Sequence, residues 1–162
     1  FGKTAVEAPE VGAIDGTTGA FGEVVTDEET GFTTGYLYGV TAGEAAEGYF
    51  ALVDETAGTV EWSLGTASNV NGTGAVATVK DTKGNAVAEF TLVIFGDVNG
   101  DAAVDNLDYG SVKNTTQGAS IAGDANTIAA DVNGDAAVDN LDYGVVKNAT
   151  QGASITNNPY VA

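Results

Sequence analysis

The spacing of apolar and polar residues divides the chain near residue 95. Before this point, short stretches of alternating apolar and polar residues are separated by glycine, a pattern typical of strands joined by turns. We predict strands over residues 59–64, 75–80 and 87–95, and a strand or two with loose chain over residues 1–30. The first part of the chain is therefore expected to be β-rich.

Two local signals refine this picture. Residues 81–85 have the composition of a hairpin connection, because Gly84 or Asn85 can take a positive φ. Thr41 and Glu44 fit a capping box, in which two side chains satisfy free amides at the start of a helix. We predict a hairpin between the last two strands and a helix over residues 45–53.

An internal repeat occupies the second part of the chain. Residues 97–121 recur as residues 131–155, and only two of the 25 aligned positions differ. The differences are Ser111 against Val145 and Thr115 against Ala149. Within each copy, a segment with helical spacing ends at glycine, which predicts helices over residues 106–117 and 140–151. Such close identity indicates tandem duplication.

Each repeat begins with oxygen-bearing residues at positions 1, 3, 5, 9 and 12 of a twelve-residue loop, with alanine at position 7. An EF-hand loop surrounds calcium with oxygen atoms from six of its positions. These are the side chains at positions 1, 3 and 5, the backbone carbonyl at 7, a residue at 9 that acts directly or through water, and a carboxylate at 12. The predicted ligands of two Ca²⁺ ions are Asp97, Asn99, Asp101, Ala103, Asp105, Asp108, Asp131, Asn133, Asp135, Ala137, Asp139 and Asp142.

The loops depart from the EF-hand pattern at two positions. The glycine expected at position 6 is Ala102 in one loop and Ala136 in the other, and a positive φ there costs on the order of 1 kcal/mol. Position 12 is aspartate instead of glutamate. The alternative is that these are only solvated acidic turns. We favour calcium binding because both copies match at every ligand position.

Composition narrows the possible chemistry. The chain has 162 residues, enough for one ordinary domain or two small ones, and it has no cysteine and no histidine. Disulfides, thiolate nucleophiles, imidazole bases and the commonest zinc ligands are therefore excluded. With 23 acidic residues against 5 basic ones, the net charge of −18 would repel nucleic acid and anionic membranes. Apolar runs are too short to span a bilayer, and the start of the chain does not resemble a signal peptide, so we expect a C-terminal piece of a larger protein.

Each copy of the repeat has the loop pattern D-x-N-x-D-x-x-V-D-x-x-D, followed by one predicted helix and lacking the helix that precedes an ordinary EF-hand loop. This duplicated pattern resembles a dockerin over roughly residues 96–156. The resemblance implies an all-α fold with two EF-hand-like calcium motifs over residues 96–162. It also implies a cohesin partner on a scaffoldin, in a secreted or cell-surface cellulosome-type complex for polysaccharide degradation in an anaerobic bacterium. Residues 1–95 resemble the X modules that precede some dockerins, a small β or α+β domain, through residues 35–39 and the missing linker.

The helices are expected to present a recognition face. Tyr109, Val112 and Thr116, with their equivalents in the second copy, lie on one stripe that we predict to be core. Gly110 and Gly144 weaken each helix and indicate close backbone approach, either to a partner or to the other helix. A second stripe runs through Leu107, Gly110 or Ser111, Asn114 and Gly118, and through the equivalent residues of the second copy, and the resemblance maps Asn106 with Leu107 and Asn140 with Leu141 to cohesin contacts. The residues predicted to bind a partner are Asn106, Leu107, Gly110, Ser111, Lys113, Asn114, Asn140, Leu141, Gly144, Val145, Lys147 and Asn148.

Near-identity of the repeats predicts that a partner can bind in two orientations related by a half-turn. Lys113 and Lys147 either pair with acids on the partner or are solvated. Three rivals remain open. A calcium sensor lacks the expected methionine groove, and an enzyme lacks acids that are not already metal ligands. A calcium-stabilised carbohydrate-binding or adhesion module would use Trp62, or Tyr36 with Tyr38, as stacking platforms.

Overall fold

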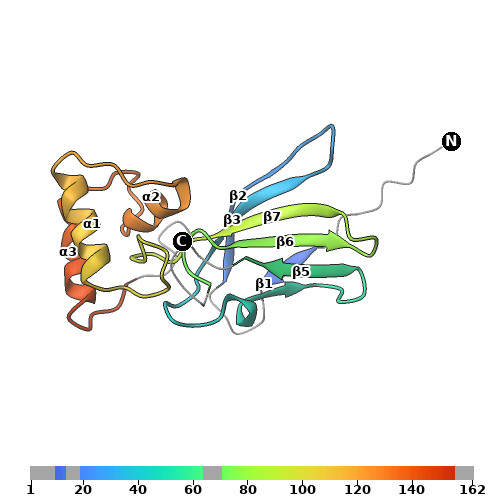
Figure 1. Ribbon diagram of the computed structural model, residues 1–162, viewed down its shortest axis with the longest axis horizontal. Helices are drawn as coiled ribbons and strands as arrows, with labels where there is room; N and C mark the ends of the chain where they lie inside the picture. The colour runs from blue at the N-terminus through green and yellow to red at the C-terminus, as the bar shows by residue number, and fades with distance from the viewer. Residues whose placement is uncertain (1–9, 14–18, 64–70, 156–162) are drawn as a thin grey trace.

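The computed structural model describes residues 10–13, 19–63 and 71–155 (Figure 1). Strands fill the first part of this range and helices the second (Figure 1). The strands are β1 (Val11–Ala13), β2 (Ala20–Thr26), β3 (Thr33–Tyr38), β4 (Phe50–Leu52), β5 (Gly58–Trp62), β6 (Val76–Asp81) and β7 (Ala86–Leu92). A 3₁₀ helix, η1 (Ala46–Gly48), precedes β4, and the α-helices are α1 (Asn106–Thr116), α2 (Asp124–Ala130) and α3 (Asn140–Ala149).

Five strands form one sheet in the order β2-β3-β7-β6-β5, and β1 pairs with β4 in a second, small sheet. All neighbours are antiparallel except β3 and β7, which run parallel. Side chains of β6 and β7 alternate between buried and more exposed, so one face of the large sheet lies in a core. Phe21 packs edge-on against Phe50 of the small sheet and against Phe90 of the large one. This first core holds the two sheets together.

The predicted strands are confirmed where the structure describes them, with small differences at their ends. β5 ends at Trp62, and residue 64 lies outside the described residues. β7 ends at Leu92 instead of continuing to residue 95. β1 and β2 account for the strands expected within residues 1–30.

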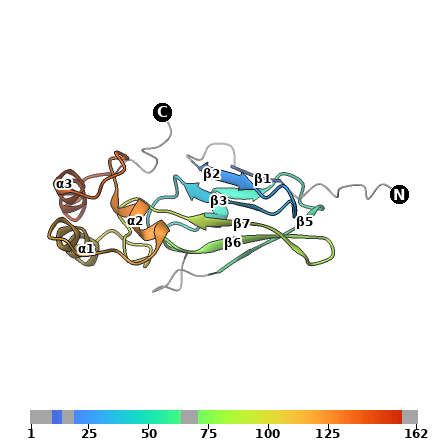
Figure 2. The same ribbon diagram turned by 90° about the horizontal axis from the view of Figure 1, so that it is seen from above.

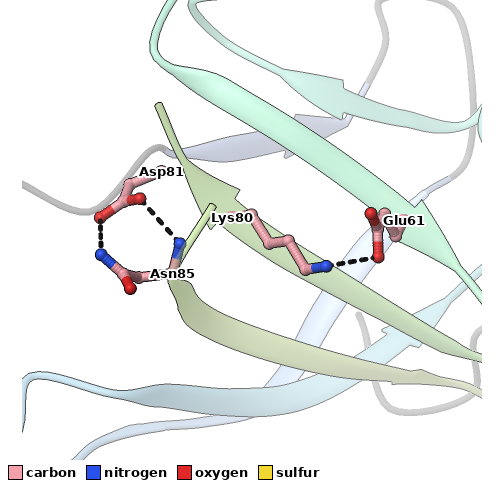
Figure 3. Close-up of polar contacts among 4 residues, drawn as sticks. All are labelled: Glu61, Lys80, Asp81 and Asn85. Carbon is pink, nitrogen blue, oxygen red and sulfur yellow. Dashed lines mark hydrogen bonds and ion pairs between the residues drawn. The ribbon is translucent and has the colours of Figure 1, made fainter. Parts of the chain in front are cut away.

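The hairpin between β6 and β7 is also confirmed (Figure 3). Gly84 takes a φ of 84°, and the Asp81 carboxylate accepts hydrogen bonds from the backbone N–H groups of Lys83 and Asn85, each at 2.9 Å. Beside the turn, Lys80 forms an ion pair with Glu61 of β5 at 2.7 Å (Figure 3). The turn residues therefore set the register of the hairpin through local hydrogen bonds.

The predicted helix over residues 45–53 is wrong. Only η1 is helical there, and β4 follows it and pairs with β1. The Tyr49 hydroxyl donates to the Glu44 carboxylate and also lies within hydrogen-bond distance of the Thr41 hydroxyl, so the two residues of the expected capping box instead bracket a tight turn. Phe50 is buried against Phe21, so burial in the sheet core outweighs the local helix signal.

The helices α1 and α3 lie side by side (Figures 1 and 2). Val112 and Val146 are fully buried between them, and the rings of Tyr109 and Tyr143 stack. The predicted core stripe is confirmed at these positions. α2 was not predicted, and it lies between the helix pair and the sheets (Figure 2). Within the described residues, no helix is both long and apolar enough to cross a membrane.

A second core joins the strand-rich and helical parts without a linker. Tyr38, Val93 and Phe95 from the first part share it with Val112 and Ala129 from the helices. The Gly96 N–H donates to the Ala129 carbonyl at 2.8 Å. The first calcium-type loop therefore begins inside a packed interface.

Candidate metal centres

Each twelve-residue loop folds back on its first aspartate. Asp97 accepts hydrogen bonds from the backbone N–H groups of Gly100, Asp101 and Ala102 at 2.9, 3.0 and 3.1 Å. Asp131 accepts the three equivalent bonds in the second loop at 3.0, 3.1 and 2.8 Å. The chain thus wraps around the carboxylate at position 1 in both copies.

The aspartate at position 12 connects the loop to its helix. Asp108 accepts from the N–H groups of Val98 at 2.7 Å and Asp105 at 2.9 Å, and Asp142 accepts from Asp139 at 2.8 Å. The side chain at position 9 caps the helix in return, and both loops form complete capping boxes. These local hydrogen bonds hold the start of each loop against its helix.

The alanines at position 6 take the left-handed backbone conformation that the loop requires. Their φ angles are 67° for Ala102 and 69° for Ala136. Each costs on the order of 1 kcal/mol relative to glycine. The EF-hand-like turn is therefore formed despite the missing glycine.

Burial makes these carboxylates unfavourable as isolated charges. Asp97, Asp108 and Asp142 are fully buried, and Asp131 is nearly so. Burial raises the pKa of Asp108 to about 6, although backbone N–H groups partly oppose the shift. It also raises the pKa of Asp97 and of Asp142, for the same first reason. A cation bound in each loop, between that loop's own aspartates, would relieve the cost of burying their charges.

The geometry of the second loop fits a hard divalent cation. In the second loop, carboxylate oxygens of Asp131, Asp135 and Asp142 lie within 4.8 Å of one another. Every donor offered by either loop is oxygen, the ligand type that calcium prefers. Asn99 and Asp101 are half-buried at the first loop, and Asn133 and Asp135 are exposed at the second. The backbone N–H groups of Ala103 and Ala137 donate to Asp101 and Asp135.

The helix faces expected to bind a partner are open. Leu107 and Leu141 are 66% and 64% exposed at the first turns of α1 and α3. A Cβ added at Gly110 or Gly144 would contact nothing within 4 Å, so neither glycine serves close approach to the other helix. The asparagines and lysines of the set are exposed, namely Asn106, Lys113, Asn114, Asn140, Lys147 and Asn148.

The two copies differ in what surrounds their variable positions. The Ser111 hydroxyl donates to the Leu107 carbonyl of its own helix, whereas Val145 packs against the second core. Ala149 lines a hollow with Phe95 of the strand-rich part. Val145 of the second copy therefore serves internal packing.

Sequence reasoning missed two contacts to the first loop. Asn126 of α2 donates to the Val98 carbonyl at 2.7 Å, and the Thr73 N–H donates to Asp97 at 2.8 Å. Thr73 lies 24 residues before Asp97, and no spacing pattern connects them. Only the fold brings these groups together.

Of the aromatic residues considered as sugar platforms, Tyr38 is fully taken up by internal packing. Tyr38 is buried and stacks between Tyr36 and Phe95. Trp62 packs against the first core. The buried Tyr38 ring therefore has no face open for stacking on a sugar, whereas Trp62 stays half-buried.

Comparison with known proteins finds a family match over the helical part of the chain. Residues 95–150 match the family model described as the dockerin type I domain. No curated protein and no solved structure matches the chain.

Proposed function

Residues 95–150 form a dockerin type I domain preceded by a β-rich region, and from this premise we propose that the chain is a calcium-dependent assembly module. Its partner is a cohesin domain on a scaffoldin. Binding anchors the parent protein in an extracellular, cellulosome-type complex of an anaerobic bacterium. Among the comparisons only the dockerin domain is detected, and we propose a non-catalytic role for the chain.

The observation that carries the proposal is the pair of exposed leucines at equivalent positions of α1 and α3. Leu107 and Leu141 each follow an exposed asparagine directly after a calcium-type loop. A single exposed leucine is ordinary, but the same exposed leucine at the equivalent position of both repeats supports a binding surface on each helix. An apolar centre with a polar rim of Asn and Lys suits a specific protein interface.

The loops position this surface. Bound Ca²⁺ would supply a fixed positive charge held by the carboxylates, the asparagine and the position 7 carbonyl of each loop. Asp108 and Asp142 lie in the first turn of each helix and also bond to the start of their loop. Because each exposed leucine immediately precedes one of these aspartates, loop geometry sets the direction in which the leucine points.

We propose the domain boundaries 1–95 and 96–162, with the first segment acting as an X module that braces the dockerin. Support comes from the second core, which contains Tyr38 and Phe95 beside Val112 and Val146. A brace of this kind reduces motion of the helices before the partner binds.

Two binding orientations are proposed because both faces carry the same exposed residues. Leu107 with Asn106 and Leu141 with Asn140 provide equivalent anchors. Val145 and Ala149 would favour the second helix only if they entered the interface, and the packing of Val145 against the second core argues for near-equal use.

Titration calorimetry of the whole chain with type I cohesins, with calcium and then with excess chelator, tests the proposal. We expect tight binding that disappears with chelator, and no binding to cohesins of another type used as the control. Calcium binding without affinity for any cohesin would contradict the proposed partner.

A further inference from the structure

A turn of the strand-rich part, residues 71–74 between β5 and β6, lies directly against the first calcium-type loop. A Cβ at Gly72 would fall 2.4 Å from the Gly100 carbonyl oxygen and 2.7 Å from the Ala102 nitrogen. The next residue, Thr73, donates its backbone N–H to Oδ2 of Asp97 at 2.8 Å. Only glycine at position 72 permits this approach.

The 71–74 turn is itself firmly held. The fully buried Thr73 hydroxyl donates to the Ile94 carbonyl at 3.2 Å and accepts from the Ile94 N–H at 3.0 Å. Gly74 donates its N–H to the Leu92 carbonyl at 2.9 Å. The N–H that reaches Asp97 is therefore fixed by the end of β7 and by Ile94 just after it, and does not belong to a loose loop.

The two loops are identical over all twelve positions, 97–108 and 131–142, yet their surroundings differ. Ala102 is 2% exposed beneath the 71–74 turn, whereas Ala136 is exposed. Asp131 and Ala136 border an open hollow of about 440 Å³ that is also lined by Phe21 and Tyr38. Any difference in ion affinity between the loops must therefore arise from tertiary contacts.

We propose that the 71–74 turn preorganises the first loop, so that two loops of identical sequence bind Ca²⁺ with unequal affinity and the first binds more tightly. This inference rests on the proposed calcium role of the loops. The Thr73 N–H orients the Asp97 carboxylate, and the packing of Gly72 holds Gly100 and Ala102 in the binding conformation. Outer partners of metal ligands typically change affinity 10- to 100-fold. Groups held in place before binding lose less freedom when the ion arrives.

Calcium titration of the whole chain, with one loop disabled at a time, tests the inference. Asp101→Ala leaves the second loop to bind, and Asp135→Ala leaves the first. The two aspartates make equivalent contacts, accepting from the N–H at position 7 and the side-chain amide at position 3 of their own loop. We expect the Asp135→Ala chain to bind Ca²⁺ at least about tenfold more tightly than the Asp101→Ala chain.

Gly72→Ala, added to each of these chains, then probes the turn. We expect it to weaken the first loop about tenfold and to leave the second unchanged. Gly48→Ala is the matched control, because a Cβ there meets nothing within 4 Å, and it should change neither affinity. Circular dichroism checks that each variant folds.

Equal affinities in the two single-loop chains would overturn the inference, and this comparison holds even if Gly72→Ala fails to fold. A folded Gly72→Ala chain in which both loops weaken equally would also overturn it. Absence of Ca²⁺ binding in both chains would instead reject the proposed calcium function itself, a result distinct from equal binding.

Discussion

The hydroxyl groups of Tyr109 and Tyr143 share a hydrogen bond across the interface of α1 and α3, and their rings stack with centroids 4.9 Å apart. These tyrosines occupy the same position of the two repeats. Their mutual contact places equivalent residues face to face, as expected at an internal two-fold axis. The symmetry detected in the sequence is thus present in the packing of the helices.

Chelation should destabilise the whole chain and not only the helices. The second core joins Tyr38 and Phe95 to Val112 and Val146, so loss of the loops also loosens the strand-rich part. Free calcium at a thousand times Kd stabilises the folded state by about 4 kcal/mol per site. Thermal unfolding followed by circular dichroism should show a single transition that moves to lower temperature with chelator. An unchanged Tm would contradict the coupling of metal to fold.

Shortening a buried side chain between the helices should lower the free energy of unfolding by the same amount in the two repeats. Val112→Ala and Val146→Ala each delete two methyl groups from fully buried sites, and we expect a loss of about 2 kcal/mol in the free energy of unfolding. Val24→Ala, at a side chain 51% exposed, is the control and should stay within about 0.5 kcal/mol. Denaturant titration measures all three, and a neutral Val112→Ala would exclude the α1–α3 core.

Cohesin affinity should respond to the two leucines in a way that reveals dual binding. If either helix can serve as the main contact, Leu107→Ala or Leu141→Ala alone should weaken binding only a few-fold. The double variant should lose about 2 kcal/mol or more, as expected for a buried apolar anchor. Val53→Ala, which removes another side chain that is 66% exposed, is the control. A full loss from one single variant would show that only one orientation is used.

Glycine at position 6 should strengthen calcium binding more in the second loop than in the first. Ala136→Gly relieves a positive φ at an exposed residue, which favours the bound loop by up to about 1 kcal/mol, or roughly fivefold. Ala102→Gly relieves the same strain but removes a buried methyl group beside the 71–74 turn. Calorimetric titration of single-loop chains compares the calcium affinities of the two glycine variants. A larger gain in affinity from Ala102→Gly than from Ala136→Gly would contradict the prediction.

Calcium binding to the first loop should release a proton near pH 6. Burial raises the pKa of Asp108 to about 6, above its value in an unfolded chain, so the metal-free folded state favours the protonated acid. Without metal, the contribution of Asp108 to the free energy of unfolding is therefore fully present below its pKa in the unfolded chain, and it is lost as the pH rises through about 6. Calcium needs the carboxylate, so affinity should fall as pH drops below about 6.

Calorimetry of the Asp135→Ala chain in two buffers with different ionisation enthalpies measures this proton release. An enthalpy independent of the buffer at pH 6 would show that Asp108 is already ionised before the ion binds.

The sequence alone determined the features that depend on neighbouring residues. Residue type and spacing within about a dozen positions dictate the geometry of the two loops, of α1 and α3 and of the hairpin at Asp81. The repeat itself is visible directly in the sequence. The positive φ of Ala102 and Ala136 was likewise foreseeable, because the loop register leaves that turn no other conformation.

Tertiary structure decided the rest. Residues 45–53 carry a helix signal, but burial of Phe50 in the sheet core made that segment a strand. α2 was not foreseen, and its alanines became a buried face only because the segment that follows β7 places Phe95 in the same core. The Thr73 N–H reaches Asp97 across 24 residues of chain, and no local propensity encodes such a contact. Long-range burial and hydrogen bonding, not local preference, therefore make two loops of identical sequence structurally unequal.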